Sequence, residues 1–321
     1  MKIQIIGAES LGVRGLCCLV QVGNRRILID PGISLGFIRN GLKPHPVQIA
    51  VGRQVKQRII EELSSATDLV ISHFHGDHIP LNDANFYQLS ILEVEEIPQN
   101  IWAHPCDPTS RRQRERELAL VIGLDRNLRQ AEGKIDEVLS FSDPVPHGQA
   151  SPNQETVSMT IIDDQQDRFL HASDIQFLHR QTIDTIIELH PDIVLASGPP
   201  LYLIRDNQAL RTKAWNNILK LSEYVPLLIL DHHLLRSTEG ALWLDELAGL
   251  TKNKIICAAD FMKINRYLLE AMRTELYQTI PVPDKWHEEL QEGSADPAEY
   301  LKHAAEAYDW FSDNPGLGKG Y

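Results

Sequence analysis

The sequence predicts a layered α/β protein of the α+β kind, in which helices cover the outer faces of packed sheets. Three observations support this prediction. Strand patterns come in pairs early in the chain, strand and helix patterns alternate later, and there are enough predicted helices to cover both faces of sheets. The chain has 321 residues, of which 43% are apolar and 23% charged, which is typical of a globular protein with a large core.

The predicted strands are short apolar runs bounded by turn residues. They cover residues 3–6, 16–22, 26–29, 70–72, 156–162, 168–172, 193–196, 227–230 and 255–258. The turn signal Gly23-Asn24 separates the second run from the third and indicates a β-meander. An Asp- and Gln-rich turn joins 156–162 to 168–172, which is typical of a hairpin.

Helical spacing of apolar residues predicts six helices. They cover residues 55–64, 83–92, 110–122, 182–188, 209–223 and 264–277. Because no Ser/Gly-rich linker divides the chain, we expect a single domain over residues 1–321. It carries an insertion near residues 98–146, rich in proline and polar groups, and a C-terminal extension near 281–321.

The composition excludes several classes of protein. No apolar run approaches the roughly 18–20 residues of a membrane helix, and the N-terminus lacks the pattern of a secretory signal, so we expect a cytoplasmic protein with no membrane partner. The net charge of −13 disfavours nucleic acid as a partner without excluding it. We expect a small-molecule substrate. Four cysteines, two of them adjacent (Cys17 and Cys18), make no disulfide framework. Oligomeric state is not readable from the sequence.

One segment concentrates groups that bind metals, the run His73-Phe-His75-Gly-Asp77-His78 at the end of an apolar strand. Residues two apart on an extended strand point the same way, so His73 and His75 can bind one ion from one side. Gly76 allows the tight turn that brings Asp77 and His78 to a second position. Imidazoles and carboxylates without thiolates suit Zn²⁺ and also admit Mn²⁺ or Fe²⁺.

The alternative interpretation of this segment is a polar turn whose imidazoles are solvated or cap a helix. With 13 His and 22 Asp in the chain, three His and one Asp at these fixed places are expected by chance only about 0.0014 times. Four ligand-type side chains within six residues therefore favour a metal site.

The HxHxDH pattern resembles the signature of the metallo-β-lactamase superfamily. That resemblance implies a four-layer αβ/βα sandwich with a metal site at the edges of the sheets. Four further segments resemble the superfamily's other motifs in the expected order. They contain Asp30 in Ile-Leu-Ile-Asp-Pro-Gly, His147 in Pro-His-Gly-Gln, Asp174 in Leu-His-Ala-Ser-Asp, and His232 in Leu-Ile-Leu-Asp-His-His.

The resemblance implies two divalent metal ions as cofactors. The implied ligands are His73, His75 and His147 for the first ion, Asp77, His78 and His232 for the second, and Asp174 for both. It also implies that Asp30 braces the site from behind the ligands. His171, Asp231 and His233 are further candidates for this supporting role, because metal-bound imidazoles usually donate their other N–H to a neighbouring acceptor.

Two assignments have alternatives. His147 follows Pro144 and Pro146, so it could belong to a surface loop, although the predicted hairpin comes directly after it, as it should. His232 and His233 compete for the last position. Successive side chains diverge, so only one is expected to face the metal, and we prefer His232 as the residue that follows Asp231.

Three stretches narrow the resemblance to a mostly archaeal, uncharacterised group of predicted metal-dependent hydrolases. They are Ser10–Arg14 (SLGVR), the IDPG motif at Asp30, and Asp231–Arg236 (DHHLLR). His75 stands where the diiron flavoprotein branch of the superfamily has Glu, which argues against that redox branch.

The leading functional hypothesis is a binuclear hydrolase that uses a metal-bridging hydroxide on an ester, thioester, lactone or phosphodiester. Asp77 and Asp174 are the expected catalytic carboxylates, because a carboxylate at the metals can orient the hydroxide or accept a proton.

There are two alternatives. The first is a nucleolytic phosphodiesterase acting on RNA or DNA, suggested by the basic run Arg111, Arg112, Arg114 and Arg116, although a solvated helix face explains that run better. The second is a structural or sensing protein that binds metal without catalysis. The retention of all seven ligands argues against it.

Overall fold

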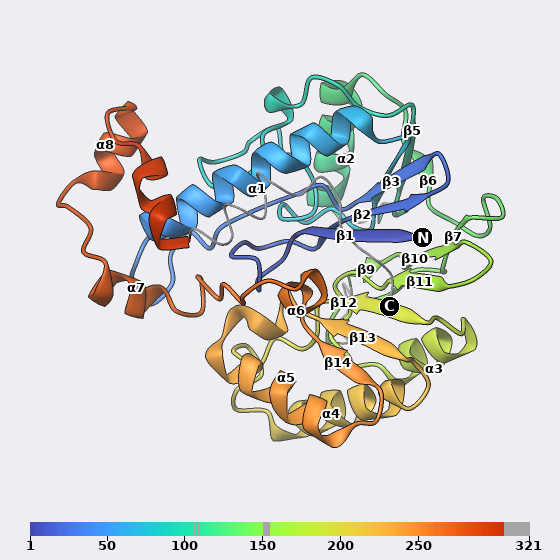
Figure 1. The fold of residues 1–321 in the computed structure, drawn as a ribbon. Helices are drawn as coiled ribbons and strands as arrows, with labels where there is room; N and C mark the ends of the chain where they lie inside the picture. Colours follow the sequence, from blue (N-terminus) through green and yellow to red (C-terminus); the bar gives the residue numbers. More distant parts are fainter. Residues whose placement is uncertain (106, 108–109, 150–154, 305–321) are drawn as a thin grey trace.

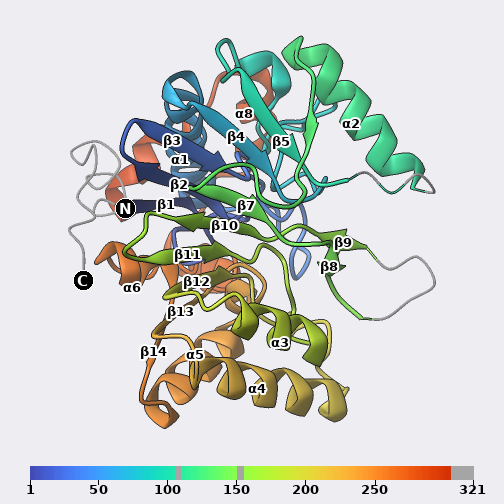
Figure 2. The same ribbon diagram turned by 90° about the vertical axis from the view of Figure 1, so that its right-hand side faces the viewer.

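Two sheets packed face to face form the centre of the molecule, and helices cover their outer faces (Figures 1 and 2). The computed structural model describes residues 1–105, 107, 110–149 and 155–304. In this part of the chain each of the two large sheets has six strands. The order of layers is helix, sheet, sheet, helix, which confirms the predicted four-layer sandwich.

The first sheet combines an antiparallel meander with parallel strands. Its order is β1 (Lys2–Gly7), β2 (Cys17–Val22), β3 (Arg25–Ile29), β4 (Asp68–Ile71), β5 (Asn100–Ala103) and β6 (Arg129–Gln130). The pairs β1·β2 and β2·β3 are antiparallel, as the Gly23-Asn24 turn indicated. From β3 to β6 all pairs are parallel.

The second sheet has a similar mixture of strand directions. Its order is β14 (Lys254–Ile256), β13 (Leu227–Leu230), β12 (Ile193–Ala196), β11 (Arg168–His171), β10 (Thr160–Asp163) and β7 (Leu139–Phe141). The predicted hairpin is the antiparallel pair β10·β11, and the pairs from β11 to β14 are parallel. A separate two-stranded ribbon joins β8 (Val145–Pro146) to β9 (Thr156–Val157).

The helices form two outer layers. Above the first sheet in Figure 1 lie α1 (Pro46–Ser65) and α2 (Arg111–Leu124), and below the second lie α3 (Arg180–Glu188), α4 (Gln208–Ser222) and α5 (Thr238–Leu250). The shorter elements are α6 (Ala258–Met262), α7 (Arg273–Thr279), α8 (Trp286–Glu292), and the 3₁₀ turns η1 (Ile91–Glu93), η2 (Leu234–Arg236) and η3 (Pro297–Ala304). None of the helices in the described ranges is long and apolar enough to cross a membrane.

Alternation along the strands divides the core into two clusters. On β3, Ile27 and Ile29 belong to the core between the sheets, whereas Leu28 packs on the other face with α1. The adjacent cysteines divide in the same way, with Cys18 in the inner cluster and Cys17 in the outer one. Burial on both faces explains why these strands are almost continuously apolar.

Helix α1 begins nine residues before the predicted start at residue 55. Pro46 occupies its first turn, where a missing N–H costs nothing. The His45 imidazole accepts a hydrogen bond from the Val47 N–H, and the Gln48 side chain accepts one from the His45 N–H. This cap starts the helix ahead of the strongly periodic segment.

Two predicted helices are wrong in whole or in part. Residues 83–92 form turns that lead into η1, because the Asn85 side chain accepts the Tyr87 N–H and the Gln88 side chain accepts the Asn85 N–H. Of 264–277, only the end is helical, as α7. Tyr267 instead pairs with the chain near Leu11 as an isolated bridge.

The span predicted to be an insertion contributes to both sheets, through β5 to the first and β7 to the second. The described part of the predicted C-terminal extension lies beside α1, where Trp286 of α8 and Tyr300 of η3 join the outer core (Figure 1). The single-domain organisation stays a prediction.

Candidate metal centre

The predicted ligands gather at the carboxyl ends of parallel strands. The segment from His73 to His78 follows β4 in the first sheet. Asp174 follows β11 in the second sheet, and the pair His232 and His233 follows β13. The carboxyl ends of parallel strands lie at one edge of a sheet, so each sheet delivers its ligands to one place. The loop after β8 adds His147.

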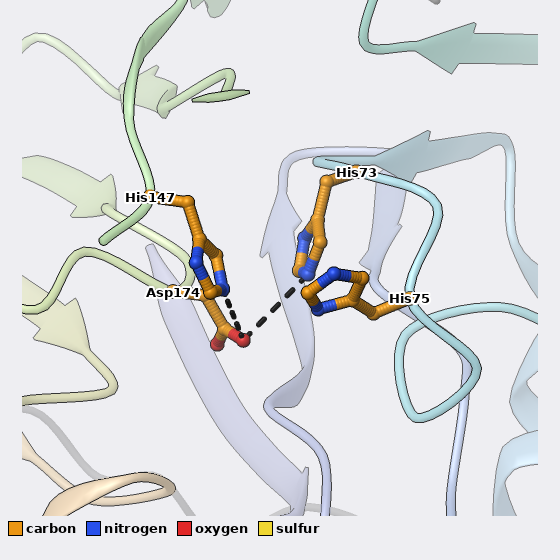
Figure 3. A group of neighbouring side chains, drawn as sticks. All are labelled: His73, His75, His147 and Asp174. Carbon is orange, nitrogen blue, oxygen red and sulfur yellow. Dashed lines mark hydrogen bonds and ion pairs between the residues drawn. The ribbon is translucent and has the colours of Figure 1, made fainter. Parts of the chain in front are cut away.

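The first group of ligands consists of His73, His75, His147 and Asp174, which Figure 3 shows converging from separate segments. One ligand atom from each lies within 4.8 Å of the others. Asp174 Oδ2 is 3.4 Å from His147 Nε2 and 3.6 Å from His73 Nε2. Two atoms bound tetrahedrally to one ion at about 2.1 Å lie about 3.4 Å apart, so these separations suit a shared divalent ion.

A second group contains Asp77, His78 and His232. His232 Nε2 is 3.4 Å from Asp77 Oδ2, and His78 Nε2 is 3.4 Å from Asp174 Oδ2. Asp174 Oδ2 therefore lies between the two groups, in the position expected of a carboxylate that bridges two ions.

The buried polar atoms in this cluster fit a bound cation. His73 Nε2, His78 Nε2 and Asp174 Oδ1 are buried and make no hydrogen bond with the described residues. An unpaired buried polar atom costs about 1–3 kcal/mol. A bound cation would accept a lone pair from each of these three atoms and so remove this cost. Nitrogen and oxygen donors of this kind suit a divalent metal.

Charge in the cluster also favours a cation. Burial raises the pKa of the Asp174 carboxyl, but the imidazoles of His233, His78 and His232 overcome this and hold it well below its usual value. Burial and the neighbouring His78 lower the pKa of His73 well below its usual value. An ionised Asp174 beside a neutral His73 is the state that metal binding requires. At His78 the charges of Asp174 and Asp30 overcome the effect of burial and raise the pKa well above its usual value, so metal binding at His78 would release a proton.

Asp30 lies behind His73 and His78 and contacts the residues that carry them. Its Oδ2 atom is 2.9 Å from His78 Nδ1 and accepts the Ser72 hydroxyl at 2.6 Å, and Oδ1 accepts the Ser72 N–H at 2.7 Å. The Ser72 hydroxyl is in turn 3.0 Å from His73 Nδ1. These bonds leave the Nε2 atoms of both imidazoles facing the cluster, because the second nitrogen of each ring is already engaged.

His232 and His233 both reach the centre. His232 is the imidazole that reaches Asp77, because its Nε2 is 3.4 Å from Asp77 Oδ2 and 3.7 Å from Asp174 Oδ2. Its Nδ1 accepts the Gly15 N–H at 3.1 Å, which places the ring hydrogen of the neutral form on Nε2, so a metal bound at Nε2 would require that hydrogen to leave this atom. His233 Nε2 is 3.2 Å from Asp174 Oδ2, and its Nδ1 lies 3.4 Å from the Ser197 hydroxyl. The second imidazole is thus a direct neighbour of the expected bridging carboxylate.

The other two supporting candidates act on the backbone around the site. Asp231 accepts N–H groups from Ser10, His232 and Ala258 at 2.9–3.0 Å, which fixes the turn that carries both histidines. His171 Nε2 donates to the Leu16 carbonyl at 2.9 Å.

Two charged residues that the sequence motifs did not assign to the site, Glu155 and Arg236, also touch the ligands. Glu155 Oε2 is 2.9 Å from His75 Nε2, on the more exposed side of the cluster. Arg236 is buried, and it donates to Glu9 Oε1 at 2.7 Å and to Asp77 Oδ2 at 3.1 Å. Arg236 lies in the DHHLLR stretch, which was the available signal, whereas nothing in the spacing of Glu155 pointed to His75.

Comparison with known proteins identifies the class. The family model described as the metallo-beta-lactamase superfamily matches residues 12–200, and the chain belongs to this superfamily. Two solved structures align with the chain at TM-scores below 0.5. The first is titled Tm1679, a metal-dependent hydrolase of the beta-lactamase superfamily, with a TM-score of 0.48 and 13% sequence identity over 80% of this chain and 96% of that one. The second is the metallo-beta-lactamase fold protein YhfI from Bacillus subtilis, with a TM-score of 0.46 and 14% sequence identity over 80% of this chain and 95% of that one.

Within the superfamily the chain groups with the UPF0282 proteins. It is 42% identical to the UPF0282 protein of Methanosarcina mazei over 94% of this chain and 100% of that one. The UPF0282 protein of Thermococcus kodakarensis is 33% identical over 87% of this chain and 96% of the relative. The chain therefore belongs to this mostly archaeal family, which confirms the resemblance seen in the SLGVR, IDPG and DHHLLR stretches.

Proposed function

We propose that the protein is a hydrolase that binds two divalent metal ions, with Zn²⁺ as the leading candidate. The observation that supports this most directly is the position of Asp174 Oδ2, which has five imidazole Nε2 atoms within 3.2–3.7 Å. We assign His73, His75 and His147 to one ion, Asp77, His78 and His232 to the other, and Asp174 to both.

Two such ions, held by these residues, would lower the pKa of a bound water towards neutrality and polarise the bond under attack. Side chains of the protein would orient this water. Burial opposes ionisation of Asp77, but the hydrogen bond and charge of His232, together with the charges of His78 and Arg236, hold its pKa well below its usual value. Asp77 and Asp174 therefore stay ionised near neutral pH, where each can accept a hydrogen bond from the attacking water and fix its direction.

The substrate would enter on the side of His147. A groove of about 350 Å³ lies there, lined by His147, Glu155, Gln176, Pro200, Leu203 and neighbouring residues. It contains both apolar and hydrogen-bonding groups, as small-molecule sites do. We propose an ester, thioester, lactone or phosphodiester as the bond cleaved, in a protein of the cytoplasm.

The test is the metal content of the purified protein, measured by elemental analysis beside the variants His73→Ala and Asp174→Ala. We expect about two ions per chain in the wild type and depletion in both variants. His303→Ala, which removes an exposed imidazole, is the matched control and should keep its metal. Full metal content in both site variants would overturn the assignment.

Turnover of bis-p-nitrophenyl phosphate and of small thioesters then separates phosphodiester from acyl chemistry. A metal-loaded protein that hydrolyses neither these nor any lactone would support a non-catalytic binding role instead.

A further inference from the structure

Helix α2 presents two arginines towards the metal-binding loop. Arg112 and Arg116 are one helical turn apart, so they share a face of the helix. Both line a groove of about 370 Å³ whose other wall is the chain from Ile79 to Asp83, directly after the HxHxDH segment. The basic run is therefore not only a solvated helix face, as its spacing had suggested.

Arg116 contacts the metal-binding loop itself. Its Nη1 atom donates to the Phe74 carbonyl at 2.5 Å, between the ligands His73 and His75. A Cβ atom placed on Gly76 would lie 3.3 Å from Arg116 Nη2, so the guanidinium also lies close to the tight turn. This contact uses one of the five N–H donors of the guanidinium, and the side chain also lines the groove.

Neither Arg112 nor Arg116 forms an ion pair with any of the described residues, and Asp83 is the carboxylate on the facing wall of the groove. Burial and the charge of Arg112 lower the pKa of Arg116, which the carboxylates of Asp83, Asp77 and Glu155 offset only in part. Asp77 already faces His232 and Arg236, and Glu155 already contacts His75. Glu115 also lines the groove, but it is paired with Arg111 at 2.6 Å.

We propose that Arg112 and Arg116 bind a carboxylate or phosphate group on the part of a small-molecule substrate that lies away from the bond cleaved. The proposal rests on the proposed function, because it places the reacting bond at the metals. A guanidinium group can donate two parallel, charge-assisted hydrogen bonds to two oxygens of a carboxylate or a phosphate. The substrate class is thus narrowed to anionic esters, thioesters, lactones or phosphodiesters.

The test is binding of α,ω-dicarboxylates from succinate to suberate, compared with monocarboxylates of the same length, by calorimetry on the metal-loaded protein. One carboxylate can bind at the metals while the second reaches the arginines at one chain length in the series. At this chain length we expect the dicarboxylate to bind about tenfold more tightly than the monocarboxylate of the same length. In Arg112→Ala and in Arg112→Ala/Arg116→Ala the ratio should fall towards one.

The single variant matters because Arg112 is exposed and its removal leaves the contact of Arg116 with Phe74 in place. Arg180→Ala is the control for total charge, since Arg180 is exposed on α3 and paired with Asp184. It should keep the wild-type ratio. A ratio near one at every length in the wild type, or an equal ratio in wild type and Arg112→Ala, would overturn the proposal.

Other results separate this proposal from the proposed function. Arginine-dependent dicarboxylate binding without any turnover would contradict the hydrolase and keep the anion site. Turnover without a preference for dicarboxylates would contradict the anion site and keep the hydrolase. Salt-dependent binding of a single-stranded RNA decamer that is tighter than any dicarboxylate and is lost in the same variants would replace the small anion with nucleic acid.

Discussion

The two sides of the metal centre differ in how tightly they are enclosed. Around Asp30 and His78 the side chains are fully buried, with 0% exposed, and every supporting bond is made by another buried group. On the opposite side His75 is 28% exposed and its partner Glu155 is 45% exposed. The difference indicates that the buried side fixes the positions of the candidate ligands, and under the proposed function the open side is where we expect a substrate to enter.

The largest effect should come from breaking the buried side at Gly32. A Cβ atom there would lie 2.2 Å from the Ile79 nitrogen and 2.3 Å from the His78 carbonyl carbon. Because both are backbone atoms, no side-chain rotation relieves the clash, and we expect Gly32→Ala to cost about 3 kcal/mol or more of unfolding free energy. Urea denaturation of the metal-free protein measures it.

Gly249→Ala is the matched control for that substitution. Gly249 is exposed near the end of α5, and a Cβ atom there would meet nothing within 4 Å. The unfolding free energy of the Gly249→Ala variant should stay within about 0.5 kcal/mol of the wild-type value or rise slightly. Equal stability of the two variants would show that Gly32 is not a tight contact.

A smaller effect, on metal content alone, should distinguish His232 from His233. His232 contacts Asp77 as well as Asp174, so we expect His232→Ala to lose one of two ions. His233→Ala should keep both and alter only the surroundings of Asp174. Elemental analysis of the two variants decides the question, and depletion in His233→Ala alone would transfer the ligand role to His233.

The smallest effect is expected on the open side, from Glu155→Gln. The hydrogen bond from His75 lowers the pKa of Glu155 from 4.5 to about 2. A depressed carboxyl pKa adds stability that is complete above about pH 4.5 and is lost as the pH falls towards 2. Because the group is half-exposed, the contribution is small.

We therefore expect the stability difference between wild type and Glu155→Gln, measured on metal-free protein, to shrink between pH 4.5 and pH 2. Glu137→Gln is the control, because Glu137 is an exposed partner of Lys134. Loss of the carboxylate behind His75 should also weaken metal binding about 10- to 100-fold. If the stability difference did not change with pH, the contact between Glu155 and His75 would not be its cause.

The same division explains what the sequence could predict. The buried side is encoded in contiguous motifs at strand ends, so local patterns were enough to propose the candidate ligands that follow β4, β11 and β13. The contacts of Glu155 and Arg116 depend on how the residue before β9 and helix α2 lie against the metal-binding loop, and no local spacing records that. Helix α5 was missed because Leu242 and Leu250 are exposed, which blurs its apolar periodicity.

The placement of the ligands on two facing sheets has a mechanical consequence. Metals bound there act as a cross-link, because His73 to His78 belong to the first half of the chain and Asp174 and His232 to the second. Each half carries an incomplete set, so capturing the ions and docking the sheets become one coupled event. Free metal at 100 times its dissociation constant would add about 2.7 kcal/mol per site to the stability of the folded chain, and chelation would remove that support from both halves at once.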